Sequence, residues 1–265
     1  MIMTRLCKTA LFLLVSVVGT PVLVGQTSLS LAPVQTEIIL NPGKSGEQKL
    51  VVGNGSPAPI KIKAEISAWT IGRPGLDVFP AEGAERLSGK DWFRLDNPEF
   101  TVPAGEQRTI SVSIAVPENA EPGQYTASLS FRTMAENEPG DPAGGLSLQG
   151  KLTALAMVTV GKPRDAGSIV DLALERKDGR AFLVLRRKNA GRFFLPTEGE
   201  IILRDARGKK AYSAEFIDDP VPPLSDRIFR IPLEGKIAAG RYEAECVLRL
   251  LSGKKSAEKR PVVID

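Results

Sequence analysis

Apolar residues recur at every second position through most of this 265-residue chain. In TISVSIAV, Ile110, Val112 and Ile114 alternate with small residues, and YTASLSF at 125–131 repeats the pattern. A period of two places successive side chains on opposite faces of an extended strand, whereas an amphipathic helix needs a period near 3.6. Few segments show the helical period, so the chain is predicted to be all-β.

Turn signals separate the alternating segments at sandwich-like spacing, as at Asn41-Pro42-Gly43 and Asp178-Gly179. Further strands are predicted at 34–40, 47–52, 59–69, 99–102, 146–160, 168–176, 180–188, 200–204, 211–217, 227–233, 241–251 and 260–264. Trp69 is out of phase with the apolar residues before it, which predicts an indole at the rim of the core.

The two halves of the chain resemble each other. PGQYTASLSF at 122–131 matches AGRYEAECVL at 239–248, and an Asn follows a strand upstream of each, Asn54 and Asn189. A Tyr at the start of a long strand, two residues after Gly, can bond its hydroxyl to nearby backbone, as in immunoglobulin-type sandwiches. The pattern predicts two tandem immunoglobulin-like antiparallel β-sandwiches, at residues 26–162 and 163–265.

The first 25 residues have the order of a secretory signal. Arg5 and Lys8 precede an apolar run at 10–18, and small residues lead to Gly25. An uncleaved membrane anchor is the alternative, but this run is well short of the ~20 residues that span a bilayer. We expect cleavage near Gly25 and a periplasmic or secreted protein that meets the membrane only through this segment.

The chain contains no histidine, which excludes a Ser-His-Asp triad, a Cys-His pair and histidine-ligated zinc. Cys246, the only cysteine after the signal segment, lies in an apolar phase and is predicted to be buried. Carboxylates are plentiful, as a glycosidase would need, but no sequence pattern gives them a cleft. We therefore expect a non-enzymatic protein without a cofactor or metal.

Most of the chain after the signal segment, and residues 29–163 most closely, also resembles the bacterial periplasmic pilus-assembly chaperone family. The resemblance lies in the segments LSLAPVQTEIILNPGKSGEQKLVVGNGSPAPIKIKAEISAW, FTVPAGEQRTISVSIAVP and LSLQGKLTALAMVTVGKP. It implies two immunoglobulin-like domains and a partner that is another exported polypeptide, bound by strand addition or in the interdomain groove. The residues that match the family's binding strand are Leu146, Leu148, Gly150 and Leu152.

The chain departs from this family at the anchor for the partner's terminal carboxylate. The family uses an Arg just inside the first strand and a Lys late in the long strand, whereas this chain has Thr36-Glu37 and Val158-Thr159-Val160. A carboxylate brought there would meet Glu37, which would repel it. The resemblance therefore implies the fold more directly than the mechanism.

An alternative function is an envelope-associated structural module that binds cell-wall or surface polysaccharide. The charge of residues 26–163 is −3, whereas that of residues 164–265 is +5. Within this excess Arg180, Arg186 and Lys188 share an alternation phase, so an anionic polymer could contact them. The same residues are equally typical of a solvated sheet face. Nucleic acid is not an expected partner, because no aromatic residues interleave with these cations.

Overall fold

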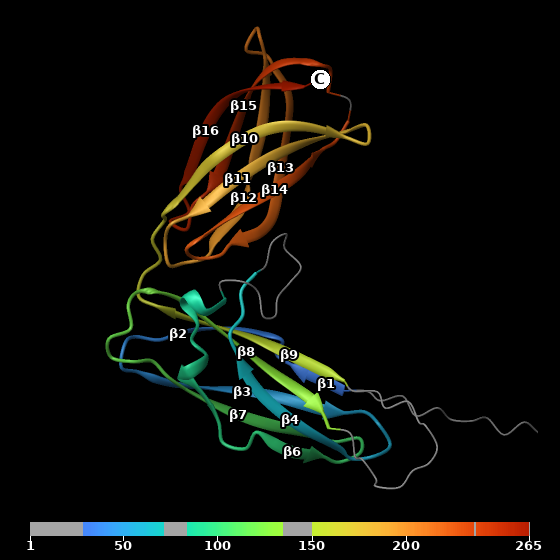
Figure 1. Cartoon of the computed structure of the whole chain (residues 1–265), viewed down its shortest axis with the longest axis vertical. Coiled ribbons are helices and arrows are strands. Elements are labelled where there is room, and N and C mark those ends of the chain that lie inside the picture. Colours follow the sequence, from blue (N-terminus) through green and yellow to red (C-terminus); the bar gives the residue numbers. More distant parts are fainter. Residues whose placement is uncertain (1–28, 72–83, 135–149, 236, 265) are drawn as a thin grey trace, which may run out of the picture.

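The computed structural model describes residues 29–71, 84–134, 150–235 and 237–264, which form two β-sandwiches arranged end to end with a bend between them (Figure 1). The predicted signal peptide and its cleavage site lie outside the described residues. Within those residues the only helices are two short 3-10 segments, η1 (Ala84–Leu87) and η2 (Lys90–Trp92). No helix of the described part is long and apolar enough to cross a membrane. The all-β prediction is confirmed.

The first sandwich packs a four-stranded sheet against a five-stranded sheet. The spatial order of the first sheet is β1 (Leu29–Ala32), β3 (Ser45–Asn54), β7 (Gln107–Ala115), β5 (Phe93–Leu95). The order of the second is β2 (Gln35–Ile39), β9 (Lys151–Val160), β8 (Gly123–Thr133), β4 (Ile60–Ser67), β6 (Glu99–Val102). The chain thus passes from one sheet to the other between β1 and β2, and β2 runs parallel to β9, unlike the other strand pairs.

The second sandwich follows a connection at 161–166 and packs a three-stranded sheet against a four-stranded sheet. The order of the smaller sheet is β10 (Gly167–Lys177), β11 (Arg180–Asn189), β14 (Ser225–Leu233). The order of the larger sheet is β13 (Lys210–Val221), β12 (Leu195–Asp205), β15 (Gly240–Arg249), β16 (Lys255–Ile264). Asp178 and Gly179 both have positive φ and close a two-residue hairpin, as their sequence predicts.

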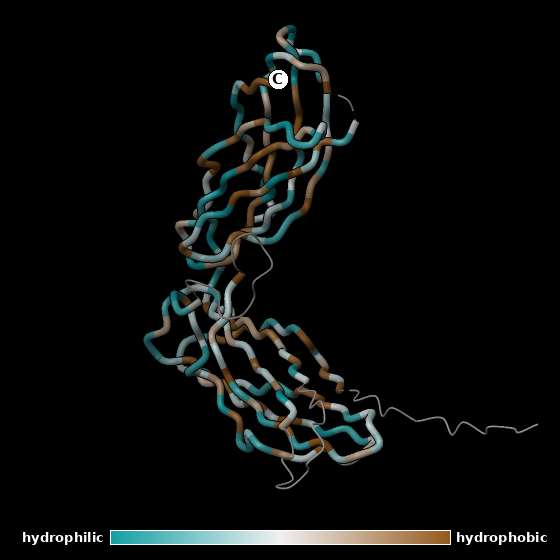
Figure 2. Tube along the Cα trace, turned by 45° about the vertical axis from the view of Figure 1, so that its right-hand side comes forward, coloured by the Kyte–Doolittle hydropathy of each residue, from teal (hydrophilic) through white to brown (hydrophobic). Residues whose placement is uncertain are grey.

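Each sandwich has its own apolar core, built from alternate residues of its strands. On β7, Ile110, Val112 and Ile114 are buried while the residues between them are exposed. Brown and teal segments alternate along the strands of both sandwiches (Figure 2). Burying a branched apolar side chain contributes about 1.5–3 kcal/mol, so this alternation fixes which face of each strand points inward.

The predicted tyrosine contacts are present in both halves. The Tyr125 hydroxyl donates to the carbonyl of Glu121 and the Tyr242 hydroxyl donates to that of Ala238, each at 2.9 Å. In both cases the acceptor lies four residues before the tyrosine. The bond holds the turn that leads into β8 or β15 against the start of that strand.

The two buried asparagines also make equivalent contacts. The Asn54 side-chain amide donates to the carbonyls of Ala58, Val102 and Pro103 at 2.8–3.1 Å. The Asn189 amide donates to the carbonyls of Phe193, Val221 and Pro222 at 2.7–3.0 Å. Each amide therefore ties the loop that follows its own strand to a distant Val-Pro segment.

Two strands and one side chain differ from the sequence predictions. β1 and β5 were not predicted. The three residues of β5 are too few to show alternation, whereas β6, which is as short as β1, was predicted. The predicted position of Trp69 at a rim is wrong, since its side chain is 4% exposed. Trp69 lies two residues after the end of β4 and packs over β9, where its indole donates to the Ala156 carbonyl at 3.2 Å.

Candidate functional site

The first third of β9 pairs with another strand on one side only. β8 pairs with β9 along its whole length, from Lys151 opposite Arg132 to Val160 opposite Gly123. On the other side β2 begins at Gln35, opposite Leu155. Within the described residues, no strand pairs with this side of β9 at 151–154, although β1, which belongs to the other sheet, lies close to β9.

The free side of β9 presents main-chain groups at alternate residues. The Gly150 carbonyl accepts from the Thr133 amide at 2.9 Å, so even-numbered residues here bond to β8. The Leu155 amide donates to the Val34 carbonyl at 2.9 Å, so odd-numbered residues point the other way. Lys151 and Thr153 consequently direct their N–H and C=O groups toward the open edge. Such an edge is a template for an added strand.

Two of the four residues predicted to bind a partner are described, and the structure brings them to this edge. Gly150 is held by Thr133, whose hydroxyl oxygen accepts from the Gly150 amide at 2.9 Å. Leu152 lies opposite Phe131 and is only half-buried, outside the cluster of buried residues that forms the first core. Leu146 and Leu148 lie outside the described residues, so their role stays a prediction.

β2 continues the same edge and carries exposed apolar residues at both ends. Val34 is 62% exposed just before β2, and Ile39 is 75% exposed at its end. Isolated large apolar side chains on a surface are common, but here they flank a strand whose outer edge is itself unpaired among the described residues.

The Glu37 carboxylate on β2 is held by neighbouring polar side chains. Glu37 of β2 accepts from the Thr159 hydroxyl at 2.8 Å and from the Gln124 amide at 3.3 Å. The Gln124 amide also donates to Thr159 at 3.2 Å. These neutral donors hold the Glu37 side chain in position without cancelling its charge, so this end of β2 repels a partner's carboxylate.

The segment at 192–194 joins the second sandwich to the first, a contact that the sequence did not reveal. The main-chain amide of Gln124 donates to the Arg192 carbonyl, and the side-chain oxygen of Gln124 accepts from the main-chain amide of Phe194, both at 2.8 Å. The Arg192 guanidinium lies 3.0 Å from Glu121 and donates to the Tyr125 hydroxyl at 2.9 Å. These four charge-assisted or main-chain contacts through one loop restrict the bend between the sandwiches.

Aromatic packing closes the same junction. The rings of Trp69 and Phe194 stack with centroids 6.1 Å apart and planes at 29°. Arg86 of η1 donates to the Leu224 carbonyl of the second sandwich. The out-of-phase Trp69 and the polar-flanked Phe193-Phe194 pair were the available sequence signals for this interface, because both break the local alternation.

The three predicted anion-contacting residues share the outer face of β11, but they do not form one cationic cluster. Arg186 binds Asp226 of β14 through Nε at 3.0 Å and Nη2 at 2.8 Å. Lys188 lies opposite Asp226 in the strand register, and Arg180 lies at the far hairpin end of β11. Asp226 therefore offsets part of the positive charge that the sequence places on this face.

The described side chains include neither a reactive thiol nor a cluster of metal ligands. The Cys246 thiol is buried as predicted, and burial raises its pKa to about 12, so it stays protonated near neutral pH. Within the described residues, no group of three or more Cys, Asp or Glu is arranged to hold a metal ion. The features that stand out are main-chain edges and interfaces.

Sequence comparisons assign no family to this chain. No known protein family matches the sequence. No curated protein matches it either.

Comparison of the fold with solved structures finds several bacterial chaperones. The chain is similar to the E. coli chaperone DraB, with 14% identity, 90% of this chain and 98% of that chain covered, and a TM-score of 0.41. It is similar to the class 5 fimbriae chaperone CfaA at 12% identity, with 90% and 100% covered and a TM-score of 0.47. It is similar to the periplasmic chaperone SfaE at 14% identity, with 89% and 100% covered and a TM-score of 0.39. The resemblance noted in the sequence is thus found as a likeness of fold.

Proposed function

We propose that this chain is an exported, non-enzymatic protein that binds an extended segment of another polypeptide by adding it as a strand to the open edge of β9. The observation that carries the proposal is the one-sided pairing of β9 at 151–154. Strand addition needs an unpaired row of main-chain groups and a neighbouring apolar position, and both occur here.

The free edge supplies affinity through main-chain bonds. Lys151 and Thr153 each offer one donor and one acceptor, and a main-chain hydrogen bond contributes about 0.5–1.5 kcal/mol net. Leu152, half-buried and outside the core cluster, would gain apolar burial from a partner side chain placed next to it. Main-chain pairing alone is tolerant of sequence, which suits an assembly factor or chaperone for more than one segment.

The partner is held differently from the way the chaperone family holds its clients. Glu37 stands where that family has a cation, so the partner's terminal carboxylate is not the anchor in this proposal. The exposed side chains of Val34 and Ile39 would instead extend the contact along β2. The N-terminal signal pattern places the encounter outside the cytoplasm, most simply in the periplasm.

A proline at the free edge tests the proposal. Thr153→Pro removes an N–H that points away from β8, so the chain's own ladder is kept. Thr153→Val is the matched control, because it also loses the hydroxyl that contacts Ser130 at 3.0 Å but keeps the N–H. The probe is a synthetic ten-residue peptide of alternating valine and serine, and the readout is amide hydrogen exchange.

We expect the peptide to slow exchange at Lys151 and Thr153, which are open, more than at Leu152 and Ala154, which already pair with β8. Thr153→Pro should abolish this effect and Thr153→Val should keep it. Replacing Leu148 and Leu152 with Glu should also prevent binding without unfolding the chain. Equal binding by the proline variant, or protection confined to other strands, would refute strand addition at β9.

Salt separates this proposal from the polysaccharide alternative. A complex held by main-chain bonds and apolar contacts should persist in 1 M salt, where the screening length is about 3 Å. A complex of a polyanion with Arg180, Arg186 and Lys188 should dissociate under the same condition. Loss of peptide binding at high salt would favour the charged face of β11.

A further inference from the structure

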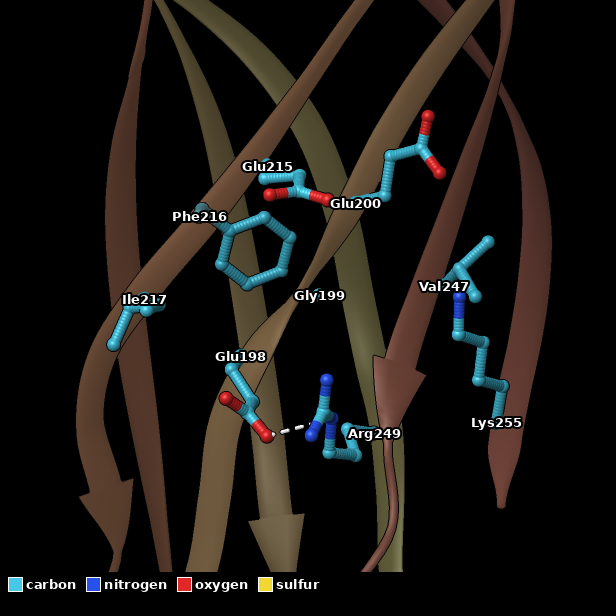
Figure 3. A pocket seen from close by; sticks show the side chains of 9 residues that line it. All are labelled: Glu198, Gly199, Glu200, Glu215, Phe216, Ile217, Val247, Arg249 and Lys255. Carbon is cyan, nitrogen blue, oxygen red and sulfur yellow. Dashed lines mark ion pairs between the residues drawn. The ribbon is translucent and has the colours of Figure 1, made fainter. Parts of the chain in front are cut away.

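The outer face of the larger sheet in the second sandwich contains a shallow hollow of about 450 Å³ (Figure 3). Gly199 lies at its centre, and side chains of β12, β13, β15 and β16 surround it. The lining side chains are those of Glu198, Glu200, Glu215, Phe216, Ile217, Val247, Arg249 and Lys255. This surface belongs to neither the β9 edge nor the domain junction.

Gly199 lies in the middle of the hollow, where the backbone of β15 leaves no room for a side chain. A Cβ atom at this position would overlap the carbonyl oxygen of Val247 and lie 3.2 Å from the Leu248 Cα atom. Both neighbours are backbone, which cannot move aside as the end of a side chain can. The buried Phe216 lies directly opposite Gly199 in the register, so the floor of the hollow is apolar.

The charges around the hollow are unevenly compensated. At one end the Glu198 carboxylate pairs with the Arg249 guanidinium at 2.8 Å. At the other end Glu200 and Glu215 lie directly opposite each other on β12 and β13. Like charges in this arrangement repel. Glu200 accepts from the Ser213 hydroxyl at 2.7 Å, but within the described residues neither glutamate forms an ion pair.

The hollow adjoins a second open edge. β13 is the outermost strand of its sheet, and among the described strands none pairs with its outer side. Ile217, opposite Glu198, is 84% exposed next to this edge. Natural edge strands are usually protected by charge, proline or a bulge. Here Asp218, Asp219 and Pro220 protect one end of β13, and in its middle the exposed Glu215 is the only charged residue between Lys210 and Asp218.

We infer that β13 is a second docking edge, and that its occupant is an extended segment of a partner polypeptide carrying a basic residue and an apolar residue two positions apart. A strand paired with β13 would place alternate side chains beside Glu215 and Ile217 on the same face. A basic side chain would offset the repulsion between Glu200 and Glu215, and its aliphatic stem would cover the floor of the hollow. The apolar side chain would cover Ile217.

Paired synthetic peptides test this inference on the full chain. One ten-residue peptide alternates lysine and valine, and the other alternates glutamate and valine. The readout is the set of NMR amide shifts assigned to 213–217 on β13. We expect the lysine peptide to shift these amides and the glutamate peptide to leave them unchanged.

Two substitutions and two matched controls locate the contact. Glu215→Gln should weaken the lysine peptide about threefold, as for an exposed ion pair. Ile217→Ser should weaken it about tenfold through lost apolar burial. Glu47→Gln on β3 and Ile228→Ser on β14 change exposed residues of the same types elsewhere and should have no effect. Neither test residue is buried, so folding is expected to be preserved.

The inference is overturned if both peptides shift β13 equally, if the controls weaken binding as much, or if neither peptide shifts it. It is also overturned if sedimentation shows that Ile217→Ser abolishes a self-associated species, since the occupant would then be a second copy of this chain. Thr153→Pro should leave binding at β13 intact, so failure at one edge does not decide the other.

Discussion

The two sandwiches share the Asn and Tyr contacts but differ two residues before each asparagine. The first sandwich has Val52 there, fully buried in an apolar core. The second has Arg187, which is 2% exposed and donates to the Pro196 carbonyl, while its Nε atom has no hydrogen-bond partner. One structural position thus accepts an aliphatic side chain in one half and a guanidinium in the other.

The buried arginine is electrostatically costly. Burial lowers the pKa of the Arg187 guanidinium, and the nearby Asp165 partly offsets that effect. Asp165 belongs to the connection between the sandwiches and accepts from the amides of Leu251 and Ser252 at 2.7 and 3.3 Å. The two halves thus differ near the connection between the sandwiches, where the charge of Asp165 acts on Arg187.

Two probes follow the sandwiches separately, as the comparison requires. Trp69 and Trp92, the only tryptophans, lie in the first sandwich, so fluorescence reports its unfolding and also the loss of the Trp69–Phe194 contact at the junction. Cys246 is buried in the second, so alkylation of its peptide reports the other. Because a protein of two domains need not unfold in one step, the free energy of unfolding is measured for each sandwich with its own probe.

A substitution at the position two residues before the asparagine should have the largest effect on stability. Val52→Arg buries a charge without a designed partner and should cost 5 kcal/mol or more, on the order of the whole stability of a domain. Arg187→Met removes a buried charge at similar volume and should change stability by less than about 2 kcal/mol. Fluorescence and Cys246 alkylation in urea measure the two effects. Comparable losses in both variants would show that Arg187 is as necessary as Val52.

Removing either asparagine should cause the next largest loss. Asn54→Ala and Asn189→Ala each leave three carbonyls without their donor, and we expect about 3 kcal/mol from each. The loss should appear in the probe of the altered sandwich. Asn97→Ala is the control, since its side chain is exposed and makes one weak contact at 3.3 Å. Losses from one asparagine only would break the equivalence of the two halves.

Removing the tyrosine hydroxyls should have a smaller effect on stability, and one that differs between the two sandwiches. Tyr242→Phe loses one hydrogen bond and should cost about 1 kcal/mol. Tyr125→Phe loses the same bond and also the acceptor for Arg192, so about 2 kcal/mol is expected. Arg192→Ala should bring the two tyrosine variants to equal cost. If Tyr125→Phe and Tyr242→Phe cost the same in the chain that keeps Arg192, the contact between Arg192 and Tyr125 contributes nothing to stability.

The smallest effect is expected at a shared turn. Gly105 has φ +71° and Leu224 has φ +54°, each three residues after the Val that accepts from the buried asparagine. A left-handed conformation costs a non-glycine residue about 1–2 kcal/mol. Leu224→Gly should therefore stabilise the second sandwich by about 1 kcal/mol, and Gly105→Leu should destabilise the first similarly. Shifts in the urea midpoints measure both, and destabilisation by Leu224→Gly would show that the leucine side chain is needed at the junction.

Much of the fold followed from local patterns in the sequence. Alternation located most strands, and Asp178-Gly179 marked its hairpin, because both signals act within a few residues. β5 was not predicted because three residues are too few to show alternation, and β1 was also missed. The Asn54 and Asn189 repeat was visible, but the three carbonyls that each amide joins come from turns far along the chain.

The candidate site was less predictable. The sequence named Gly150 and Leu152, whereas the one-sided pairing depends on where β2 begins relative to Leu155. Alternation separated Arg187 from Arg186, but it could not distinguish a buried arginine from one on a solvated face. The acidic hollow around Gly199 could not be predicted, because its lining residues come from four strands and lie together only when those strands are paired in register.

The sequence alone determined an all-β chain with two similar halves, because hydrophobic periodicity and turn chemistry act over short distances. Tertiary structure decided which edges stay unpaired, where Glu37 is held, and how Arg192 and Trp69 join the sandwiches. Those features depend on strand register and on contacts between residues far apart in the chain, such as Glu37 and Thr159, which are 122 positions apart. A local sequence pattern carries no information about such pairs.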